Sequence, residues 1–280
     1  MHRLLIQSLR WLDVRMVYLV TSLFVIPVCL LLNTNHSRTS AYHFYRYRLR
    51  YGRLRAAWSV YVNHCLFSQV VVDRFAVFAG KHFHLDIEGY EQFRLLELEP
   101  KGFMIFSSHI GCYEVAGYSL ISKTKRFNAL VFGGEKATVM TGRQEVLGHH
   151  NIRMIPVKED MSHLFLVNEA LDNNEIMSMP ADRIIGSAKF ITSVFMDAEA
   201  CFPAGPLSVA AMKGLDVLAV NVMKTSAKHY KVYVARLSYD KQAPRRQQMQ
   251  QLADSYVKEL ERRVRQYPLQ WFNFYDFWSR

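Results

Sequence analysis

The stretch GFMIFS, residues Gly102 to Ser107, is an apolar run with Pro100-Lys101 before it and His109 soon after it. Short apolar runs bounded by polar or turn residues are typical of strands that are buried on both faces of a sheet. Similar runs occur at residues 128–132, 153–157, 175–179, 217–223 and 230–237. Helical patterns lie between the runs, near residues 113–122, 138–149, 161–172 and 206–213. Strands separated by helices predict an α/β fold with a mostly parallel central sheet flanked by helices.

The last long element is predicted to be a helix over residues 247–266. Leu252, Tyr256, Leu260 and Val264 recur in it at a spacing of four residues, which places them on one helical face. A proline stands on each side, at positions 244 and 268, as is common at helix boundaries. No internal repeat and no linker rich in Gly, Ser or Pro interrupts the chain, so one catalytic-type domain is the simplest organisation.

The composition excludes several classes of protein. Half of the 280 residues are hydrophobic and 13% are aromatic, which excludes a disordered chain. The four cysteines have no C-x-x-C spacing, so neither a disulfide framework nor a zinc site is expected, and a reducing compartment is favoured. No phosphate-binding or dinucleotide-binding glycine motif occurs, so nucleotide hydrolysis and dinucleotide binding have no support. We expect no metal, because His82-x-His84 has no completing ligand at a suitable spacing.

An uncharged apolar run stands near the beginning of the chain. Met16 to Leu32 reads MVYLVTSLFVIPVCLLL, and as a helix it would be about 25 Å long, close to the roughly 30 Å of a bilayer hydrocarbon core. We predict an N-terminal hydrophobic membrane-anchor helix within residues 1–35, kinked near Pro27, followed by one domain over residues 36–280. No A-x-A-like site follows the run, which disfavours a cleaved signal peptide. A buried core helix and a helix that lies in the membrane remain alternatives to a spanning one.

The net charge of +11 comes largely from the segment that follows this run. Residues 33–55 contain six arginines and no acidic residue. Such segments stay on the cytoplasmic side of a membrane and attract anionic headgroups. Aromatic residues alternate with these arginines, as they do at membrane interfaces and in some nucleic-acid binders. Because the apolar run is adjacent, we predict an anionic membrane surface as partner and no nucleic acid, with the domain on the cytoplasmic side of the inner membrane.

The candidate catalytic residues follow the strand predicted at 102–107, in the segment SSHIGCYE of residues 107–114. If Gly111 turns the chain from strand to helix, the Glu114 carboxylate can accept a hydrogen bond from one ring nitrogen of His109. That contact would fix the tautomer and stabilise the imidazolium form. The other nitrogen can then take a proton from a substrate hydroxyl as general base. A histidine and a glutamate at this spacing are also common as a core or capping pair, and the spacing alone leaves both interpretations open.

The segment FSSHIGCYEVAG around His109 and Glu114 resembles the H-x-G-x-W-E box of the bacterial lipid A biosynthesis (lauroyl/myristoyl) acyltransferases. That box is a version of the H-x4-D/E motif of the glycerolipid acyltransferase superfamily. Further segments resemble the same family in order: MPADR at 179–183, VFMDAEACFPAGP at 194–206 and PLQWF at 268–272. Tyr113 replaces the usual Trp, Ala204 stands where the superfamily often has Glu, and the ending 272–278 lacks the usual basic tail. With these differences, the sequence resembles a divergent branch of the family.

The resemblance implies a membrane-associated O-acyltransferase. It would move a fatty acyl group from a thioester, on acyl carrier protein or coenzyme A, to a hydroxyl of a lipid acceptor. A lipid A precursor, a lysophospholipid or a related lipid would serve as acceptor. The resemblance makes His109 the general base and Glu114 its orienting partner, with no acyl-enzyme and no cofactor beyond the acyl donor. The residues expected to bind substrate are Ser108, Asp182, Arg183 and Gly205, with Arg183 as the cation for an oxyanion or a phosphate.

Two other classes of function stay open at this point. A lipid hydrolase or thioesterase would use Ser107, Ser108 or Cys112 as nucleophile with a nearby histidine, although no G-x-S-x-G elbow occurs. A non-catalytic protein that binds membranes or nucleic acid would use the positive charge alone. Acyl transfer from a labelled carrier protein to membrane lipids separates the three.

Overall fold

The structure is a computed structural model that describes residues 2–32, 36–112, 120–134, 151–184 and 189–278. Its centre is a seven-stranded sheet in the order β1-β9-β8-β2-β5-β3-β4. The strands are β1 (His84–Glu88), β2 (Phe103–Ser107), β3 (Phe127–Val131), β4 (Ile152–Pro156), β5 (Ile176–Pro180), β8 (Asp216–Lys224) and β9 (His229–Leu237). Neighbours are parallel except β8 and β9, which are antiparallel. The predicted mostly parallel sheet is confirmed.

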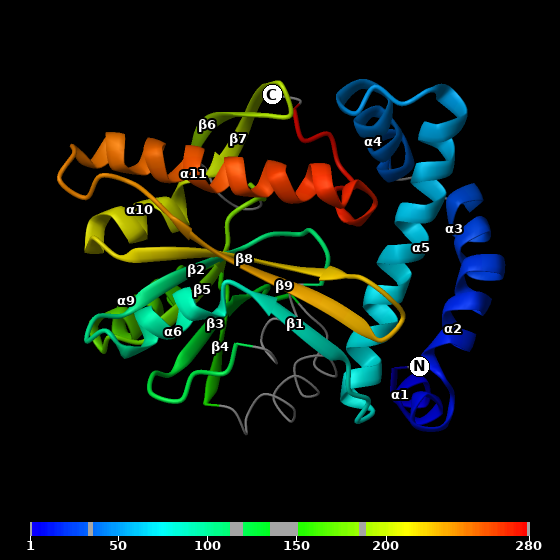
Figure 1. Ribbon diagram of the computed structural model, residues 1–280, viewed down its shortest axis with the longest axis horizontal. Coiled ribbons are helices and arrows are strands. Elements are labelled where there is room, and N and C mark those ends of the chain that lie inside the picture. Colours follow the sequence, from blue (N-terminus) through cyan, green and yellow to red (C-terminus); the bar gives the residue numbers. More distant parts are fainter. Residues whose placement is uncertain (1, 33–35, 113–119, 135–150, 185–188, 279–280) are drawn as a thin grey trace.

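Helices cover both faces of this sheet, and the side chains of β2 show why. Met104 and Phe106 pack on one face, in a core shared with α9 (His163–Asp172), α10 (Ala204–Lys213) and α11 (Arg245–Gln266). Phe103 and Ile105 pack on the other face, in a core shared with α6 (Tyr90–Leu98). This alternation is the two-residue period of a strand. Figure 1 shows α11 crossing one face of the sheet.

A small hairpin outside the main sheet, β6 (Phe190–Phe195) and β7 (Ala198–Pro203), leads into α10. Met196 and Asp197 at its tip have φ of 53° and 63°, as two-residue hairpin turns require. The Met196 main-chain N–H donates to the Glu261 carboxylate of α11 at 2.7 Å, which holds the tip against α11. The sequence predicts no strand here, because much of the hairpin is exposed and its apolar residues form no continuous run.

The N-terminal part of the chain is helical and lies at one end of the molecule (Figure 1). Its segments are α1 (His2–Trp11), α2 (Val14–Val20), η1 (Thr21–Val25), α3 (Ile26–Leu32), α4 (Ser37–His43), η2 (Phe44–Arg48) and α5 (Arg53–Phe78). Val14–Leu32 is one apolar helix, long enough to cross a membrane, and only 17% of its most apolar window is buried. We call it the N-terminal rod. Its three segments all contact α5, and its low burial disfavours the alternative of a core helix.

A π-helical turn, η1, stands just before Pro27, where the sequence predicts a kink. Proline has no N–H group, and in a regular helix its ring collides with the carbonyl four residues earlier. A π turn contains an extra residue, and here the Ile26 N–H bonds to the Thr21 carbonyl. The wider turn makes room for the ring, so the helix continues as α3.

A buried ion pair fixes the helical end of the molecule to the sheet. The Lys224 ammonium at the end of β8 pairs with the Asp73 carboxylate of α5, and both side chains are at most 4% exposed. Tyr18 of the N-terminal rod and Tyr230 of β9 donate hydrogen bonds to the same carboxylate. Removing one partner of a buried pair leaves the other charge uncompensated, at a cost of about 3–5 kcal/mol. The cluster therefore holds the rod and α5 in one position relative to the domain.

Candidate active site

The carboxyl ends of β2 and β5 bring the candidate catalytic residues together. The two strands are parallel neighbours with Ser107 opposite Pro180, and the Ala181 N–H donates to the Ser107 carbonyl at 3.0 Å. The chain therefore leaves both strands at the same edge of the sheet, and each candidate residue stands two positions after its strand. This edge is where α/β proteins commonly bind their ligands.

His109 and Asp182 meet at this edge through two contacts. One Asp182 carboxylate oxygen lies 2.8 Å from His109 Nδ1, and the other accepts the His109 main-chain N–H at 2.7 Å. Asp182 is 1% exposed, whereas the His109 side chain is 26% exposed. The buried carboxylate thus orients the ring, and the ring itself remains accessible from solvent.

The Asp182 carboxyl is ionised in spite of its burial. Burial by itself raises the pKa of this carboxyl, but the charge and hydrogen bonds of His109 and the nearby Arg183 guanidinium outweigh burial. They hold the pKa of Asp182 below its ordinary value of 3.8. A carboxylate in this position also stabilises the imidazolium that forms when the ring accepts a proton.

Gly111 gives the chain its turn after His109, as predicted. Its φ is +63°, and a Cβ at this position would lie 1.9 Å from the Val222 carbonyl oxygen of β8. The same oxygen accepts the Cys112 N–H at 2.7 Å. Only glycine fits such a close approach with a left-handed backbone.

Arg183 places a cation directly beside the pair. One of its terminal nitrogens donates to the Phe272 carbonyl at 2.6 Å, and the guanidinium carbon lies 5.8 Å from the centre of the Tyr275 ring. Its Nε atom is buried and has no hydrogen-bond partner among the described residues. A buried N–H group is costly to leave unpaired, so this group is suited to receive an acceptor atom from a bound ligand.

Ser108 and Cys112 lie on either side of His109 in the sequence and are both buried. Ser108 is 2% exposed, and its hydroxyl donates to the Asn221 side chain of β8 at 2.6 Å. Cys112 is also 2% exposed. These side chains face into the packed sheet, which disfavours either of them as the nucleophile of a hydrolase.

The family model of the bacterial lipid A biosynthesis acyltransferases matches residues 76–280, which include this site. The chain belongs to this family. Among solved structures, the crystal structure of the 1-acyl-sn-glycerophosphate (LPA) acyltransferase PlsC from Thermotoga maritima is similar to 97% of the acyltransferase and 99% of that chain, with 14% identity and a TM-score of 0.42. No curated protein matches the acyltransferase in sequence. The predicted family and acyltransferase activity are confirmed.

Two further predicted site residues of the acyltransferase are Glu114 and Gly205. Glu114 lies outside the described residues, so its orienting role stays a prediction, and the described partner of His109 Nδ1 is Asp182. Gly205 lies in the first turn of α10, where an added Cβ would meet nothing within 4 Å. The substrate-binding roles predicted for Ser108, Asp182, Arg183 and Gly205 stay predictions. Asp182 was not predicted to contact His109, although both follow an apolar strand by two residues.

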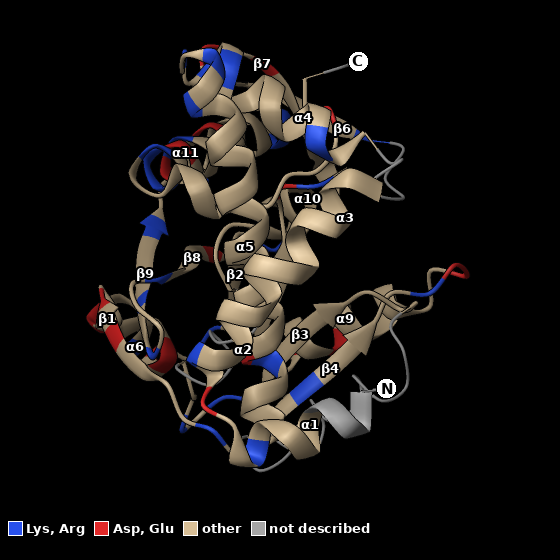
Figure 2. Cartoon of the chain, turned by 90° about the vertical axis from the view of Figure 1, so that its right-hand side faces the viewer, with Lys and Arg blue, Asp and Glu red and all other residues tan. Residues whose placement is uncertain are grey.

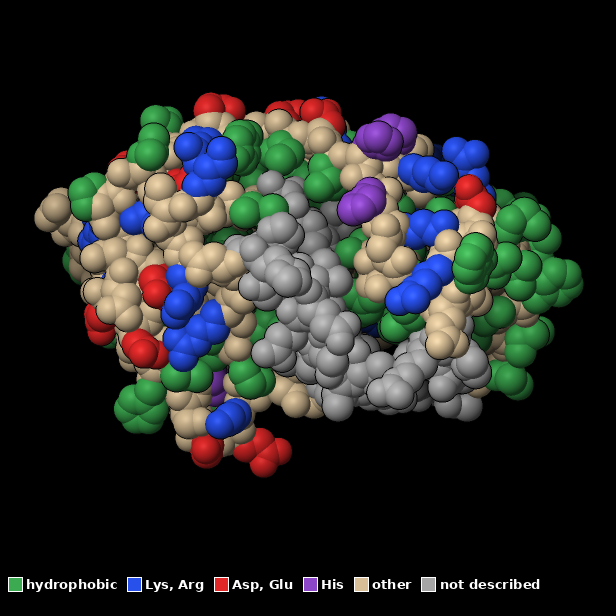
Figure 3. Space-filling model, turned by 90° about the horizontal axis from the view of Figure 1, so that it is seen from below, with side chains coloured by type: hydrophobic (Ala, Val, Ile, Leu, Met, Phe, Trp, Pro, Cys, Tyr) green, Lys and Arg blue, Asp and Glu red, His purple; other side chains and the backbone are tan. Residues whose placement is uncertain are grey.

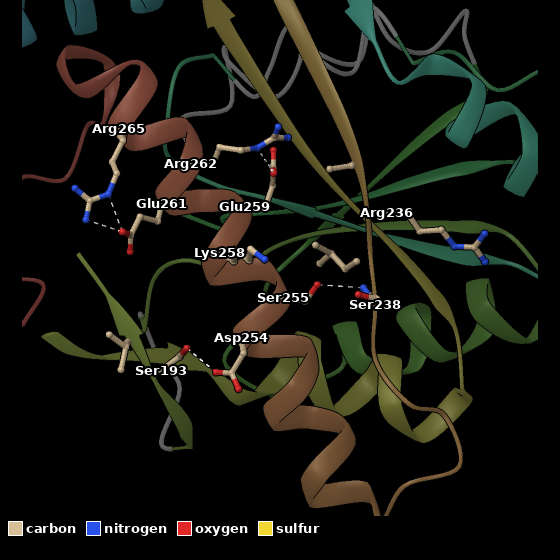
Figure 4. Close-up of a pocket in the computed structure, with 13 residues that line it drawn as sticks. Ser193, Arg236, Ser238, Asp254, Ser255, Lys258, Glu259, Glu261, Arg262 and Arg265 are labelled. Atoms are coloured by element: carbon tan, nitrogen blue, oxygen red, sulfur yellow. Dashed lines mark hydrogen bonds and ion pairs between the residues drawn. The ribbon is translucent and has the colours of Figure 1, made fainter. Parts of the chain in front are cut away.

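A hollow of about 960 Å³, lined mostly by polar and charged residues, lies elsewhere on the acyltransferase, between β6, β9 and α11 (Figure 4). Much of its charge is already paired: Arg262 bonds to Glu259 at 2.8 Å, and Arg265 bonds to Glu261 at 2.7 Å. Its Leu237 stands opposite Val217, near the start of β8, and the start of β8 lies beside the start of β2. His109 follows the other end of β2, so this hollow is separate from the His109 site.

Proposed function

We propose that the acyltransferase moves a fatty acyl group from a thioester, on acyl carrier protein or coenzyme A, to a hydroxyl of a lipid acceptor. A lipid A precursor, a lysophospholipid or a related lipid is the proposed acceptor. The single observation that carries this proposal is the accessible His109 ring held by the buried Asp182 carboxylate at the carboxyl edge of the sheet. A thioester is already activated, so a base and a site for the oxyanion are sufficient for transfer.

The proposed reaction uses His109 as the general base. With Nδ1 turned toward Asp182, Nε2 takes the proton from the acceptor hydroxyl as its oxygen attacks the thioester carbonyl carbon. The carbonyl oxygen becomes an oxyanion in a tetrahedral intermediate, for which the Arg183 guanidinium is the candidate partner. Collapse of the intermediate forms the ester and expels the thiolate, which takes the proton back from the imidazolium. The ring is then neutral again, and no acyl-enzyme is formed.

An assay with purified protein tests this proposal. The protein is incubated with labelled acyl thioesters of acyl carrier protein or coenzyme A, together with a bacterial membrane lipid extract. We expect a labelled lipid ester to form, with one thiol released for each ester. Thiol release at the same rate without acceptor lipid, together with a labelled fatty acid as product, would instead indicate a thioesterase.

The proposed location is the cytoplasmic side of the inner membrane. The N-terminal rod supports it, because its outward face carries apolar side chains such as Phe24 and Leu31, which are 67% and 79% exposed. Leu54 and Trp58 of the adjoining α5 are 89% and 64% exposed. In Figure 2 the surface over α2, α3 and the middle of α5 carries few charges, and Figure 3 shows hydrophobic side chains gathered at this end. Such a surface is typical of attachment to a membrane.

The rod lies along α5 and does not project from the domain, which favours a rod that lies in the membrane surface over one that spans it. Three arginines of the cationic segment 33–55 contact other groups of the protein. The Arg48 and Arg55 guanidinium carbons stand 4.4 Å and 3.8 Å from the centres of the Trp278 and Tyr51 rings, and Arg38 donates to the Leu30 carbonyl at 3.1 Å.

A charge introduced on the apolar face is expected to detach the protein from membranes. Phe24→Glu should lower binding to vesicles that contain anionic phospholipid by about tenfold or more, because burying a carboxylate in lipid is costly. Val194→Glu is the matched control, because Val194 is 66% exposed on β6, away from the rod. Co-flotation with vesicles measures the difference. Equal binding by both variants would show that the rod is not the membrane-binding surface.

A further inference from the structure

The closing segment of the chain, residues 268–272, lies against the turn that carries His109. The Gly111 N–H donates to the Gln270 carbonyl at 2.8 Å, and the Phe272 N–H donates to the His109 carbonyl at 3.1 Å. Between these two bonds, Ile110 and Trp271 form an isolated antiparallel bridge. The turn is therefore paired along its main chain with the closing segment, in the manner of two short strands.

The side chain of Gln270 connects this pairing to the central sheet. Its amide oxygen accepts the Lys224 main-chain N–H at 2.9 Å, and its amide nitrogen donates to the Lys224 carbonyl at 2.7 Å. Lys224 is the last residue of β8, and Gln270 is only 7% exposed. The glutamine thus uses its main chain for the catalytic turn and its side chain for the strand next to β2. An amide suits this contact, because it offers a donor and an acceptor side by side.

The closing segment is also fixed on the side of the N-terminal helices. Asn63 of α5 is 1% exposed, and its amide nitrogen lies 2.9 Å from the Leu269 carbonyl and 3.1 Å from the Trp271 carbonyl. The Tyr45 hydroxyl donates to the Pro268 carbonyl at 3.0 Å. The segment is therefore held at both ends, and Gln270 is the residue through which it reaches β8.

We propose that Gln270 is a positioning residue for acyl transfer, and that it holds the main chain of the His109 turn by locking the closing segment to the end of β8. The inference rests on the proposed role of His109. A base must stand within hydrogen-bond reach of the proton that it removes, and a displacement of about 1 Å costs on the order of 10²-fold in rate. Loss of the two side-chain bonds of Gln270 frees the closing segment from the end of β8, and the His109 turn then keeps its direct bond from Cys112 to Val222 but loses the support of the closing segment.

Gln270→Met removes both side-chain bonds while it keeps a similar volume. We expect it to lower kcat by about 10- to 100-fold, with KM changed by less than about threefold, because the base is displaced and the lipid-binding surfaces are not. Hydrogen exchange of peptides that contain Gly111 should become faster, because the partner of the Gly111 N–H moves away. Gln248→Ala is the matched control, since Gln248 is also buried and donates to two carbonyls, of Lys241 and Ala243. Its kcat should stay within about threefold of wild type.

Gln270→Glu gives a second readout that a purely structural role would not move. An ionised carboxylate can accept the Lys224 N–H but cannot donate to the Lys224 carbonyl, whereas a protonated carboxyl can do both. The kcat of this variant relative to wild type at the same pH should therefore rise as the pH falls. The pH dependence of Gln270→Glu also tests the positioning role if Gln270→Met does not fold.

Three outcomes would overturn the positioning role of Gln270. They are an unchanged kcat in Gln270→Met, an equal loss in Gln248→Ala, and no recovery of Gln270→Glu at low pH. Hydrogen exchange distinguishes a wrong positioning role of Gln270 from a wrong catalytic role of His109. If His109 proves dispensable for transfer but the Gln270 variants still loosen the turn, then the catalytic assignment is wrong and the contact between Gln270 and the turn is right.

Discussion

His109→Ala is expected to lower kcat for acyl transfer by about 10²–10⁴-fold, the range that a positioned general base contributes. The ring is the only imidazole that the structure, within its described residues, holds against a buried carboxylate at the carboxyl edge of the sheet. Without it, the acceptor hydroxyl must attack before its proton is removed. KM for the acyl donor should change little, because the imidazole acts on the acceptor hydroxyl in the transition state.

The control for this variant is His229→Ala. His229 is an exposed histidine of β9 whose ring contacts Ser226 at 2.9 Å, and its removal should leave kcat within about twofold of wild type. Circular dichroism and vesicle binding should be unchanged in both variants. Full activity in a folded His109→Ala protein would exclude the base assignment. A covalently trapped acyl group on Ser107 or Cys112 would favour the hydrolase alternative.

Much of the sheet could be predicted from the sequence, because its strands are buried on both faces. The apolar runs at 102–107 and 175–179 correspond to β2 and β5 within one residue at each end, since a parallel strand between two helical layers leaves almost no exposed position. The same burial allowed His109 to be predicted as a candidate catalytic residue, because it is the first side chain able to act as a base after a continuous apolar strand. The turn at Gly111 was also predictable, because few residues other than glycine permit it.

The contact between His109 and Asp182 could not be predicted from spacing along the chain. It depends on β2 and β5 being neighbours in register, and the order of strands is a property of the whole sheet. Sequence proximity favoured Glu114, five residues from His109, and that prediction lies outside the described residues. The proposed role of Gln270 could not be predicted from the sequence either, because its partners Gly111 and Lys224 are far from it along the chain.

The structure of the helical end of the molecule was the part least predictable from the sequence. The apolar run of 16–32 predicted one anchor helix, but its packing against α5 depends on contacts between Tyr18 of the run and the distant residues Asp73 of α5 and Lys224 of β8. The long helix α5 itself was not predicted. It carries polar residues such as Asn63 and Asp73 that are buried only because the closing segment and β8 supply partners for them. Local patterns cannot report such partners.

Asp182→Asn is expected to lower kcat by about 10²–10⁴-fold while the protein remains folded. Asparagine has a similar size but carries no charge, so it cannot stabilise the imidazolium, and its amide can turn an N–H toward Nδ1 and favour the wrong tautomer. Asp86→Asn is the control for the loss of one negative charge, since the Asp86 side chain of β1 is 78% exposed, and its kcat should equal that of wild type.

The pH dependence of stability gives an independent test of the Asp182 contact. The pKa of Asp182 is held below its ordinary value of 3.8, so the folded state favours the carboxylate more than the unfolded state does. The stabilisation is therefore complete above the ordinary pKa and is lost as the pH falls through the lower, folded-state pKa. The free energy of unfolding of wild type relative to that of Asp182→Asn should decrease as the pH falls below about 4, where the Asp182 carboxylate becomes protonated. A difference between the two proteins that stays unchanged as the pH falls from about 5 to about 2 would mean that the carboxyl is not held ionised by His109 and Arg183. The orienting role of Asp182 would then have to be given up.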